Sequence, residues 1–497
     1  MATLRARSGL IAAIVIALAF VLYTTYSLRN SGDTQQTIKI PSQVEQDYTD
    51  SPIGEWKPVL PETSKPKEPE EEKEKQPEKE GDKETEHELL RYPIYKPNHT
   101  SALPPVVDNF PLAAAAHSAA DLPPIPKWNQ PPSPHVPEMT PLFIGFTRNW
   151  RLLQQTVVSH ITAGWPAEDI YVFENTGTMK SNEQGLLSLQ NPFFLNHTRL
   201  HMFGVNIIIT PTLFNFAQLQ NFFLWTAIEK NYTTYFWGHM DVVAMSAEPV
   251  SLGTNSSEYE GHSSIYTGAV KALRSAISSE PDPNASDPEK PWAARFFAYD
   301  RLALVNRAAY ESIGGFDTAI PYYYSDCDMH DRLKMYGFEY NGPDVKVGNV
   351  TDVAGSLDDL LVLYRTKDGP EAGFVVDRPK TEERREEQDL RSFTREEGKH
   401  WVTDSPNSKA HLQLLDVVGA MAEAKGGGDA RNSWQARQSG GKGEPYYRDP
   451  EGFEIAIAMT TQTGKDIYAE KWGHKACSLL EWGRKAGDEW RIEHDWE

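Results

Sequence analysis

The sequence has only two cysteines, Cys327 and Cys477, and it lacks any excess of basic residues. Two cysteines exclude a zinc site built from a cysteine cluster, but they permit one disulfide if they meet in an oxidising compartment. The formal net charge of −21 argues against a nucleic-acid partner, because phosphates require a basic surface. With 39% hydrophobic residues, the chain can still build a sizeable core.

Apolar side chains are missing from the acidic segment 65–88, which has no aliphatic residue and no Phe, Trp or Tyr. Such a segment cannot bury a core and is expected to stay disordered. The many prolines of segment 122–141 indicate an extended chain. We therefore expect residues 29–139 to form a disordered stem, which either holds a folded body away from a membrane or is a plain tail.

Charge is absent from residues 8–28, an apolar run close to the ~20 residues that a membrane-spanning helix needs. Arg5 and Arg7 precede it, so the positive-inside rule predicts a cytosolic tail over residues 1–7, a signal anchor over 8–28 and a lumenal remainder. A cleaved signal peptide is the alternative, although the run is long for one. Six glycosylation triplets agree with lumenal exposure; they begin at Asn98, Asn196, Asn231, Asn255, Asn284 and Asn349.

From residue 140 onwards, short apolar runs alternate with helix-like spacing. The expected strands are 141–146, 169–175, 205–210 and 233–238, and the expected helices between them include 149–165 and 214–230. One further strand and one further helix are expected within residues 295–317. This alternation predicts an α/β fold with a mostly parallel central sheet flanked by helices. Ligands of such sheets bind at the carboxyl ends of the strands, so the residues that follow each strand are candidates for a site.

Three regions follow the predicted stem. Residues 140–365 form the expected folded domain, and residues 366–463 form a variable, partly disordered insertion with one packed helix around 409–424. Residues 464–497 are expected to form a C-terminal segment that packs on the domain, because they are rich in aromatic residues.

The first two strands are followed by "TRN" and "ENTG". Arg148 is a candidate for holding a phosphate, and Glu174 for holding a ribose hydroxyl or a base edge. Surface salt bridges are the simpler explanation of each residue alone. Their placement after successive strands favours a binding site.

The motif "HMD" follows the fourth strand and contains His239 and Asp241. In an extended chain, residues two apart face the same side, so one divalent cation can contact both. An imidazole with a carboxylate suits Mn²⁺. The alternative is a helix cap formed by Asp241 beside a packed His239.

Asp326 and Asp328 lie in "SDCD", at a predicted strand-to-helix junction. Free N–H groups at a helix start stabilise a carboxylate, which can then act as a general base. The alternatives are capping by either aspartate and a helical ion pair between Asp328 and Arg332. Asp331 and Arg332 are expected to be solvated.

These motifs, with "GGFDTAIPYYYSDCDMHDRLKMYG", resemble the GT-A glycosyltransferases, closest in style to inverting family 2 and related Golgi enzymes. The late segment "DIYAEKWGHKACSLLEW" resembles the C-terminal Lys-Trp-Gly segment of uncharacterised fungal relatives. The resemblance covers residues 140–365 and 464–482 and implies a GT-A fold, which is a Rossmann-like sheet flanked by helices.

The resemblance also implies a cation site. "HMD" occupies the place of the family's metal-binding DXD motif, so Asp241 would hold Mn²⁺ or Mg²⁺ against the donor diphosphate. His239 replaces the first acid of that motif. His474 would be a third metal ligand, because a late histidine sometimes serves in this role.

The catalytic residues implied by the resemblance are Asp326 as the base and Asp328 as a supporting acid. "SDCD" matches the family's Glu-Asp-x-Asp pattern, with Ser325 in place of the glutamate. The residues expected to bind the donor are Thr147, Arg148, Glu174 and Asn175.

The expected function is therefore that of a hexosyltransferase in the Golgi membrane, with type II topology and a lumenal catalytic domain. Its partners would be a nucleotide-sugar donor and a hydroxyl of a glycan or glycoconjugate, with inversion at the anomeric carbon. Two alternatives remain at this point. One is an inactive GT-A body that binds glycans or acts as a scaffold, and the other is a secreted or surface structural protein.

Overall fold

The computed structural model describes most of the chain after residue 103, together with Tyr95 and Lys96, and these residues lie in the compact unit Leu89–Glu497. The described ranges are 95–96, 104–248, 262–278, 290–340, 347–376, 401–426, 438 and 440–496. The predicted anchor 8–28 and most of the predicted stem lie outside them. No helix within these ranges is long and apolar enough to cross a membrane.

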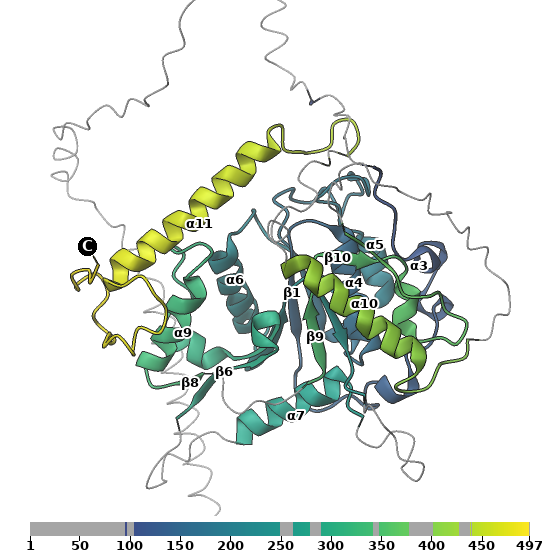
Figure 1. Cartoon of the computed structure of the whole chain (residues 1–497), viewed down its shortest axis with the longest axis horizontal. Coiled ribbons are helices and arrows are strands. Elements are labelled where there is room, and N and C mark those ends of the chain that lie inside the picture. Colours follow the sequence, from purple (N-terminus) through teal and green to yellow (C-terminus); the bar gives the residue numbers. More distant parts are fainter. Residues whose placement is uncertain are drawn as a thin grey trace, which may run out of the picture. The chain divides into compact units, whose positions relative to one another are not determined.

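A seven-stranded sheet forms the centre of the molecule, in the order β3-β2-β1-β4-β7-β6-β8 (Figure 1). Its strands are β1 (Leu142–Phe146), β2 (Ile170–Glu174), β3 (Asn206–Ile209), β4 (Thr234–Gly238), β6 (Trp292–Phe297), β7 (Leu302–Asn306) and β8 (Glu339–Tyr340). Strands β3, β2, β1 and β4 are parallel to one another, and so are β6 and β8. The predicted α/β class with a mostly parallel sheet is confirmed.

Strand β7 runs antiparallel to both of its neighbours, β4 and β6. The sequence pattern predicted one strand where the structure has β6 and β7. Only the short turn 298–301 joins these two strands, and a connection of that length permits only an antiparallel pair. This hairpin turn later proves to be part of the candidate site.

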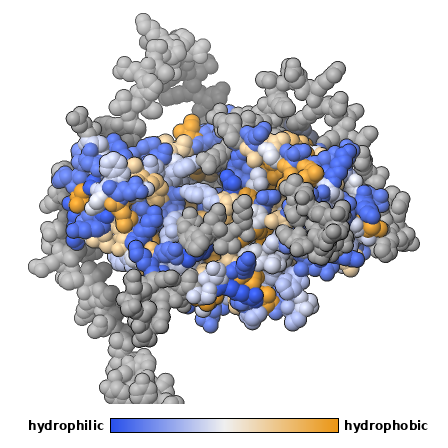
Figure 2. All heavy atoms as spheres, turned by 60° about the horizontal axis from the view of Figure 1, so that its bottom comes forward, coloured by the Kyte–Doolittle hydropathy of each residue, from blue (hydrophilic) through white to orange (hydrophobic). Residues whose placement is uncertain are grey.

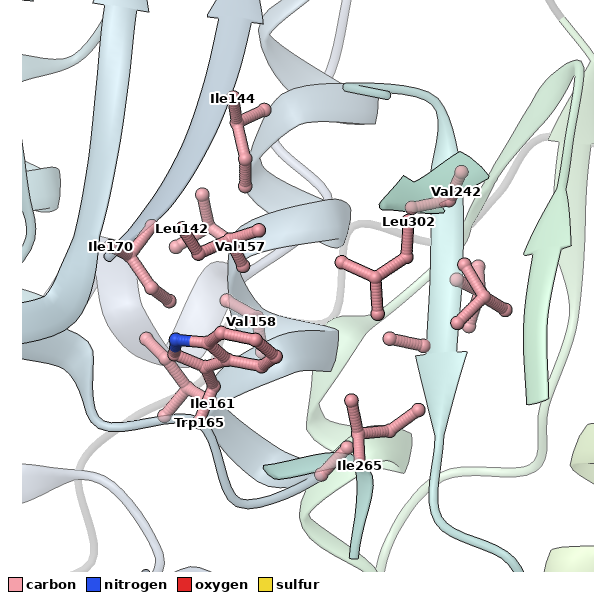
Figure 3. Close-up of a cluster of buried hydrophobic side chains, with 14 of the residues drawn as sticks. Leu142, Ile144, Val157, Val158, Ile161, Trp165, Ile170, Val242, Ile265 and Leu302 are labelled. Atoms are coloured by element: carbon pink, nitrogen blue, oxygen red, sulfur yellow. The ribbon is translucent and has the colours of Figure 1, made fainter. Parts of the chain in front are cut away.

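Helices cover both faces of the sheet. They are α4 (Trp150–Thr162), α5 (His197–Phe203), α6 (Phe216–Glu229), α7 (Ile265–Ser278), α8 (Arg307–Ser312) and α9 (Ser325–Met335). Because strand side chains alternate between faces, Leu142 and Ile144 enter one core cluster and Phe143 enters the other. Figure 3 shows Leu142 beside Val157 of α4, with Ile144 on one side of this pair and Trp165 on the other. Burying each of these large side chains contributes about 1.5–3 kcal/mol.

The segment 104–139 packs against this body, contrary to the expectation that it belongs to a disordered stem. It contains α3 (Pro111–Ala115), η1 (Ala119–Asp121) and η2 (Lys127–Asn129). Phe110 is fully buried, with its ring centroid 6.2 Å from that of Phe203, and Leu122 also joins the core. The proline-rich composition of the segment suggested disorder, although Phe110 and Leu122 anchor it to the core.

Two small antiparallel sheets extend the domain. One pairs β5 (Val242–Met245) with β9 (Asn349–Asp352), and the other pairs β10 (Gly355–Leu357) with β11 (Phe374–Val376). Between β10 and β11 lies η5 (Leu360–Tyr364).

Helix α10 (Lys409–Gly426) contacts β9, β10 and β11. Leu414, Val418 and Met421 form its buried stripe, with the spacing of an amphipathic helix. The packed helix expected around 409–424 is confirmed.

The long helix α11 (Pro450–Trp472) lies beside α9 (Figure 1). The predicted boundary between residues 463 and 464 falls inside this helix. Tyr468 and Trp472 are fully buried together with Ile320. A disulfide between Cys327 and Cys477 joins α9 to the segment after α11.

On the face that Figure 2 shows, hydrophilic residues are interrupted by hydrophobic patches.

Candidate metal and catalytic site

His239, Asp241 and Asp352 form a cluster that can hold a metal ion. Each offers one ligand atom, and these atoms lie within 4.8 Å of one another. His239 and Asp241 follow the carboxyl end of β4, as predicted. Asp352 ends β9, which pairs with β5 so that Val242 lies opposite it.

Strand pairing creates this cluster. The N–H of Val353 donates to the Asp241 carbonyl at 2.9 Å, which fixes the two strand ends side by side. Gly238 lets the β6–β7 turn approach β4, since a Cβ there would lie 3.1 Å from the Arg301 carbonyl oxygen. The sequence did not indicate Asp352 as a candidate metal ligand, because no local pattern shows which strand a short polar strand pairs with.

The Lys425 ammonium lies between the two carboxylates. Its Nζ donates to Asp241 Oδ2 at 2.6 Å and also to Asp352 Oδ1. Burial disfavours the ammonium, but the charges and hydrogen bonds of the two aspartates outweigh it and raise the pKa of Lys425. The lysine comes from the last turn of α10, in the region predicted to be a variable insertion.

The turn Ala298–Arg301 connects this cluster to Asp326. Ala298 and Tyr299 both adopt left-handed backbone conformations, with φ of +56° and +61°, which are costly for residues other than glycine. Asp300 Oδ2 lies 3.5 Å from His239 Nε2. The Tyr299 hydroxyl donates to Asp326 Oδ2 at 3.4 Å. Neither residue was predicted to belong to the site, because a short hairpin turn carries no motif.

His239 and Asp300 stabilise each other's charged forms. Burial lowers the pKa of His239, but the hydrogen bond and charge of Asp300, aided by Asp241 and Asp352, raise it overall. Burial raises the pKa of Asp300, and His239 reverses this, so the net pKa is lowered. A metal ion bound at the cluster would need His239 as a neutral imidazole. Binding of the ion would therefore release a proton from the His239 imidazolium.

Asp326 lies in the first turn of α9, which begins at Ser325 where a helix was predicted. Burial raises its pKa, and the charge of Asp300 adds to this, while the N–H of Cys327 and the Tyr299 hydroxyl oppose it. A half-buried carboxylate with a raised pKa is suited to accept a proton.

Asp328 is fully buried and its oxygens are engaged by neighbouring donors. It accepts from Arg332 Nε at 2.8 Å, Lys471 Nζ at 2.7 Å and Trp472 Nε1 at 2.9 Å. The helical ion pair with Arg332 that the sequence suggested is therefore present. These contacts tie α9 to α11, so Asp328 as a supporting acid would act through helix position and not by touching a substrate.

Asp331 and Arg332 are buried, so the expectation that they are solvated is wrong. Asp331 accepts from the N–H of Leu479 at 3.0 Å. Arg332 donates to the carbonyls of Ile313 and Gly315 at 2.9 and 2.6 Å. The crowded aspartates of α9 thus have separate partners, which offset part of their mutual repulsion.

The predicted donor-binding residues lie at the neighbouring ends of β1 and β2. Glu174 is buried and accepts from Asn182 at 2.8 Å, with His197 Nε2 at 2.7 Å. The Asn175 side chain bonds to the backbone of Phe214. These contacts shape the surrounding loops, and binding of a donor by Glu174 and Asn175 stays a prediction.

Thr147 is partly exposed and Arg148 is buried. The Arg148 guanidinium lies 6.0 Å from the ring centroid of Phe453, which stacks on Tyr447 at 3.9 Å. Donor binding by Thr147 and Arg148 also stays a prediction.

His474 does not join the metal cluster. It follows α11, where its Nδ1 lies 2.8 Å from Asp495 Oδ2 and its ring packs on Trp482. Asp352, and not His474, is the third candidate metal ligand beside His239 and Asp241. The late histidine is held away because α11 and the disulfide anchor its segment beside α9.

Comparison with known proteins does not establish a family for this chain. No family model matches the chain, and no curated protein matches it. Among solved structures, it is similar to the mannosyltransferase PcManGT from Pyrobaculum calidifontis in complex with GDP-Man and Mn²⁺. The identity is 13% and the TM-score 0.26, and the match covers 44% of this chain and 58% of that one. A similarity this low does not identify a function.

Proposed function

We propose that the chain is a glycosyltransferase of the GT-A kind, which moves a sugar from a nucleotide-sugar donor to a hydroxyl of a glycan or glycoconjugate. The observation that carries the proposal is the link between two groups of residues. The His239–Asp241–Asp352 cluster and Asp326 are joined through Asp300 and Tyr299 of one turn. The strand ends of β4, β6 and β9 and the start of α9 supply this arrangement.

The cluster fits a divalent cation. One imidazole and two carboxylates are a donor set that suits Mn²⁺, and Mg²⁺ with more of its water retained. His239, Asp241 and Asp352 would hold the ion. When bound, it would supply positive charge for the departing diphosphate.

Asp326 would act as the general base. It would take the proton of the acceptor hydroxyl while that oxygen forms a bond to the anomeric carbon and the bond from that carbon to the diphosphate breaks. Attack from the side opposite the leaving group inverts the anomeric carbon. Tyr299, whose hydroxyl contacts the Asp326 carboxylate, would hold the base in position.

A second candidate function is that of an inactive GT-A protein that binds glycans or acts as a scaffold. The contact of Lys425 with both cluster carboxylates favours it, because the ammonium fills the place of the cation. The replacement of an acid by His239 points the same way.

We also propose the Golgi location, with type II topology and a lumenal domain. The disulfide between Cys327 and Cys477 supports an oxidising compartment.

A thermal-shift screen of the full chain against UDP-, GDP- and CMP-sugars, with and without Mn²⁺, tests the proposal. The donor that stabilises the protein is then used to measure sugar transfer and donor hydrolysis. Asp326→Asn should lower the rate by about 10²–10⁴-fold while the thermal shift is retained. Asp416→Asn, on the exposed face of α10, is the matched control. If the protein binds a donor but catalyses neither sugar transfer nor donor hydrolysis with any metal ion, the inactive glycan-binding protein would be favoured.

A further inference from the structure

Lys425 occupies the position that a cation would take in the candidate metal site. Its ammonium bonds to one oxygen of Asp241, at 2.6 Å, and to one oxygen of Asp352. All three side chains are largely buried, with 10%, 16% and 19% exposure for Lys425, Asp241 and Asp352. Little water therefore screens these charges.

The helix that carries Lys425 is firmly held. Near its start, Arg365 donates to Glu248 at 2.9 Å and approaches His411 Nδ1 at 2.9 Å. Asn407 also donates its N–H to Glu248. Farther along, the buried stripe of α10 lies in the main core. Displacing the helix would break the contact of His411 with Arg365 and expose the buried stripe.

The side chain of Lys425 is the part that can move. It has four methylene groups and lies in the last helical turn, so rotation about its bonds can withdraw the ammonium without moving the helix. The carbonyls at this helix end favour a nearby positive charge, so the withdrawn ammonium would still have a favourable electrostatic position.

The charges of the site do not allow both cations at once. Asp241 and Asp352 supply two negative charges, and one ammonium leaves a net negative charge that attracts a divalent ion. A divalent ion bound to both carboxylates would lie beside the ammonium, and repulsion between like charges at such separations is several times the thermal energy.

We propose that Lys425 is an internal cation that alternates with a divalent metal ion at His239, Asp241 and Asp352. The inference deepens the proposed function, because it takes the cluster to be the metal site of that transferase. With the ammonium inserted, one oxygen of each carboxylate is bound to it and the site is closed to metal. Withdrawal of the side chain opens it.

Titration of the full chain with Mn²⁺, followed by the electron paramagnetic resonance signal of free Mn²⁺, tests the alternation directly. Lys425→Met should bind Mn²⁺ at least about tenfold more tightly than the unchanged protein, because a competing charge has been removed. Lys425→Arg keeps the charge and should bind no more tightly than the unchanged protein. Lys409→Met, an exposed lysine in the first turn of the same helix, is the matched control and should change nothing. Adding Asp352→Asn to Lys425→Met should abolish the gain.

Equal or weaker Mn²⁺ binding by Lys425→Met would overturn the proposal, and so would the absence of Mn²⁺ binding by every variant. A second measurement needs no substitution. Acylation of Lys425 by an amine-reactive ester, quantified by mass spectrometry, should increase when Mn²⁺ is saturating. An unchanged extent of acylation with Mn²⁺ bound would also overturn it.

The two proposals can fail separately. A gain in Mn²⁺ affinity without any sugar transfer would support the alternation and count against the transferase. If sugar transfer depends on the metal but the Lys425→Met protein binds Mn²⁺ less tightly, the transferase would be supported and the alternation would be contradicted.

Discussion

The charge of Asp300 acts on Asp326 across the turn that contains Tyr299. Asp300 is one cause of the raised pKa of Asp326, after burial. A general base works in its deprotonated form, so sugar transfer should decline as the pH falls through this raised pKa.

We expect Asp300→Asn to move the acid limb of the kcat/KM profile to lower pH, because one charge that favours protonated Asp326 is removed. The profiles of both proteins, measured with the same donor and acceptor, provide the test. An acid limb that stays in place would show that a group other than Asp326 sets it.

Lys471 provides a second prediction at the scale of single residues. It is 5% exposed and bonds to Asp328 at 2.7 Å and Asp317 at 2.8 Å. Lys471→Met should lower the free energy of unfolding by about 3–5 kcal/mol, because it removes one of the two counter-charges of the buried Asp328 and a counter-charge of the partly buried Asp317. Urea denaturation measures the change, with the exposed Lys485→Met as control. A loss no larger than in the control would mean that Arg332 alone compensates Asp328.

At the scale of elements, α10 is anchored by its apolar stripe. Met421 is fully buried, whereas Leu412 on the same helix is 44% exposed. Met421→Ala should cost about 2–5 kcal/mol of unfolding free energy, since it opens a cavity in the core. Leu412→Ala should stay within about 0.5 kcal/mol of the unchanged protein. Similar small losses in both, measured by urea denaturation, would contradict the packing of α10 against the body.

Elements also decide which residues of the site meet. Asp241 and Asp352 are 111 positions apart in the sequence and become neighbours because β5 and β9 pair. Lys425 reaches them because α10 packs on the same strand pair. Local patterns predicted α10 as a helix, but no local pattern states which strand a helix covers.

At the scale of the whole molecule, segment 104–139 belongs to the folded body. A chain of residues 140–497 should therefore be less stable than one of residues 104–497, by at least about 1.5–3 kcal/mol, because the burial of Phe110 against Phe203 and Tyr364 is lost. Urea denaturation of the two chains measures the difference. Equal midpoints and slopes would show that the contacts of Phe110 and Leu122 are not needed for stability.

The periodicity of apolar residues was sufficient for the strands β1 to β4 and for the helices α4 and α6, because each is decided by side chains within a few positions of one another, but it did not indicate the short helix α5. Local sequence also predicted three features of the site for the same reason: the helix start at Ser325, the carboxylate of Asp326 and the pair His239–Asp241. The cluster around them was not. Asp352, Asp300 and Lys425 enter it, and His474 stays out of it, through strand pairing, a hairpin turn and helix packing between distant segments. Those contacts depend on the free energy of the complete fold, so they exist only once the chain has folded.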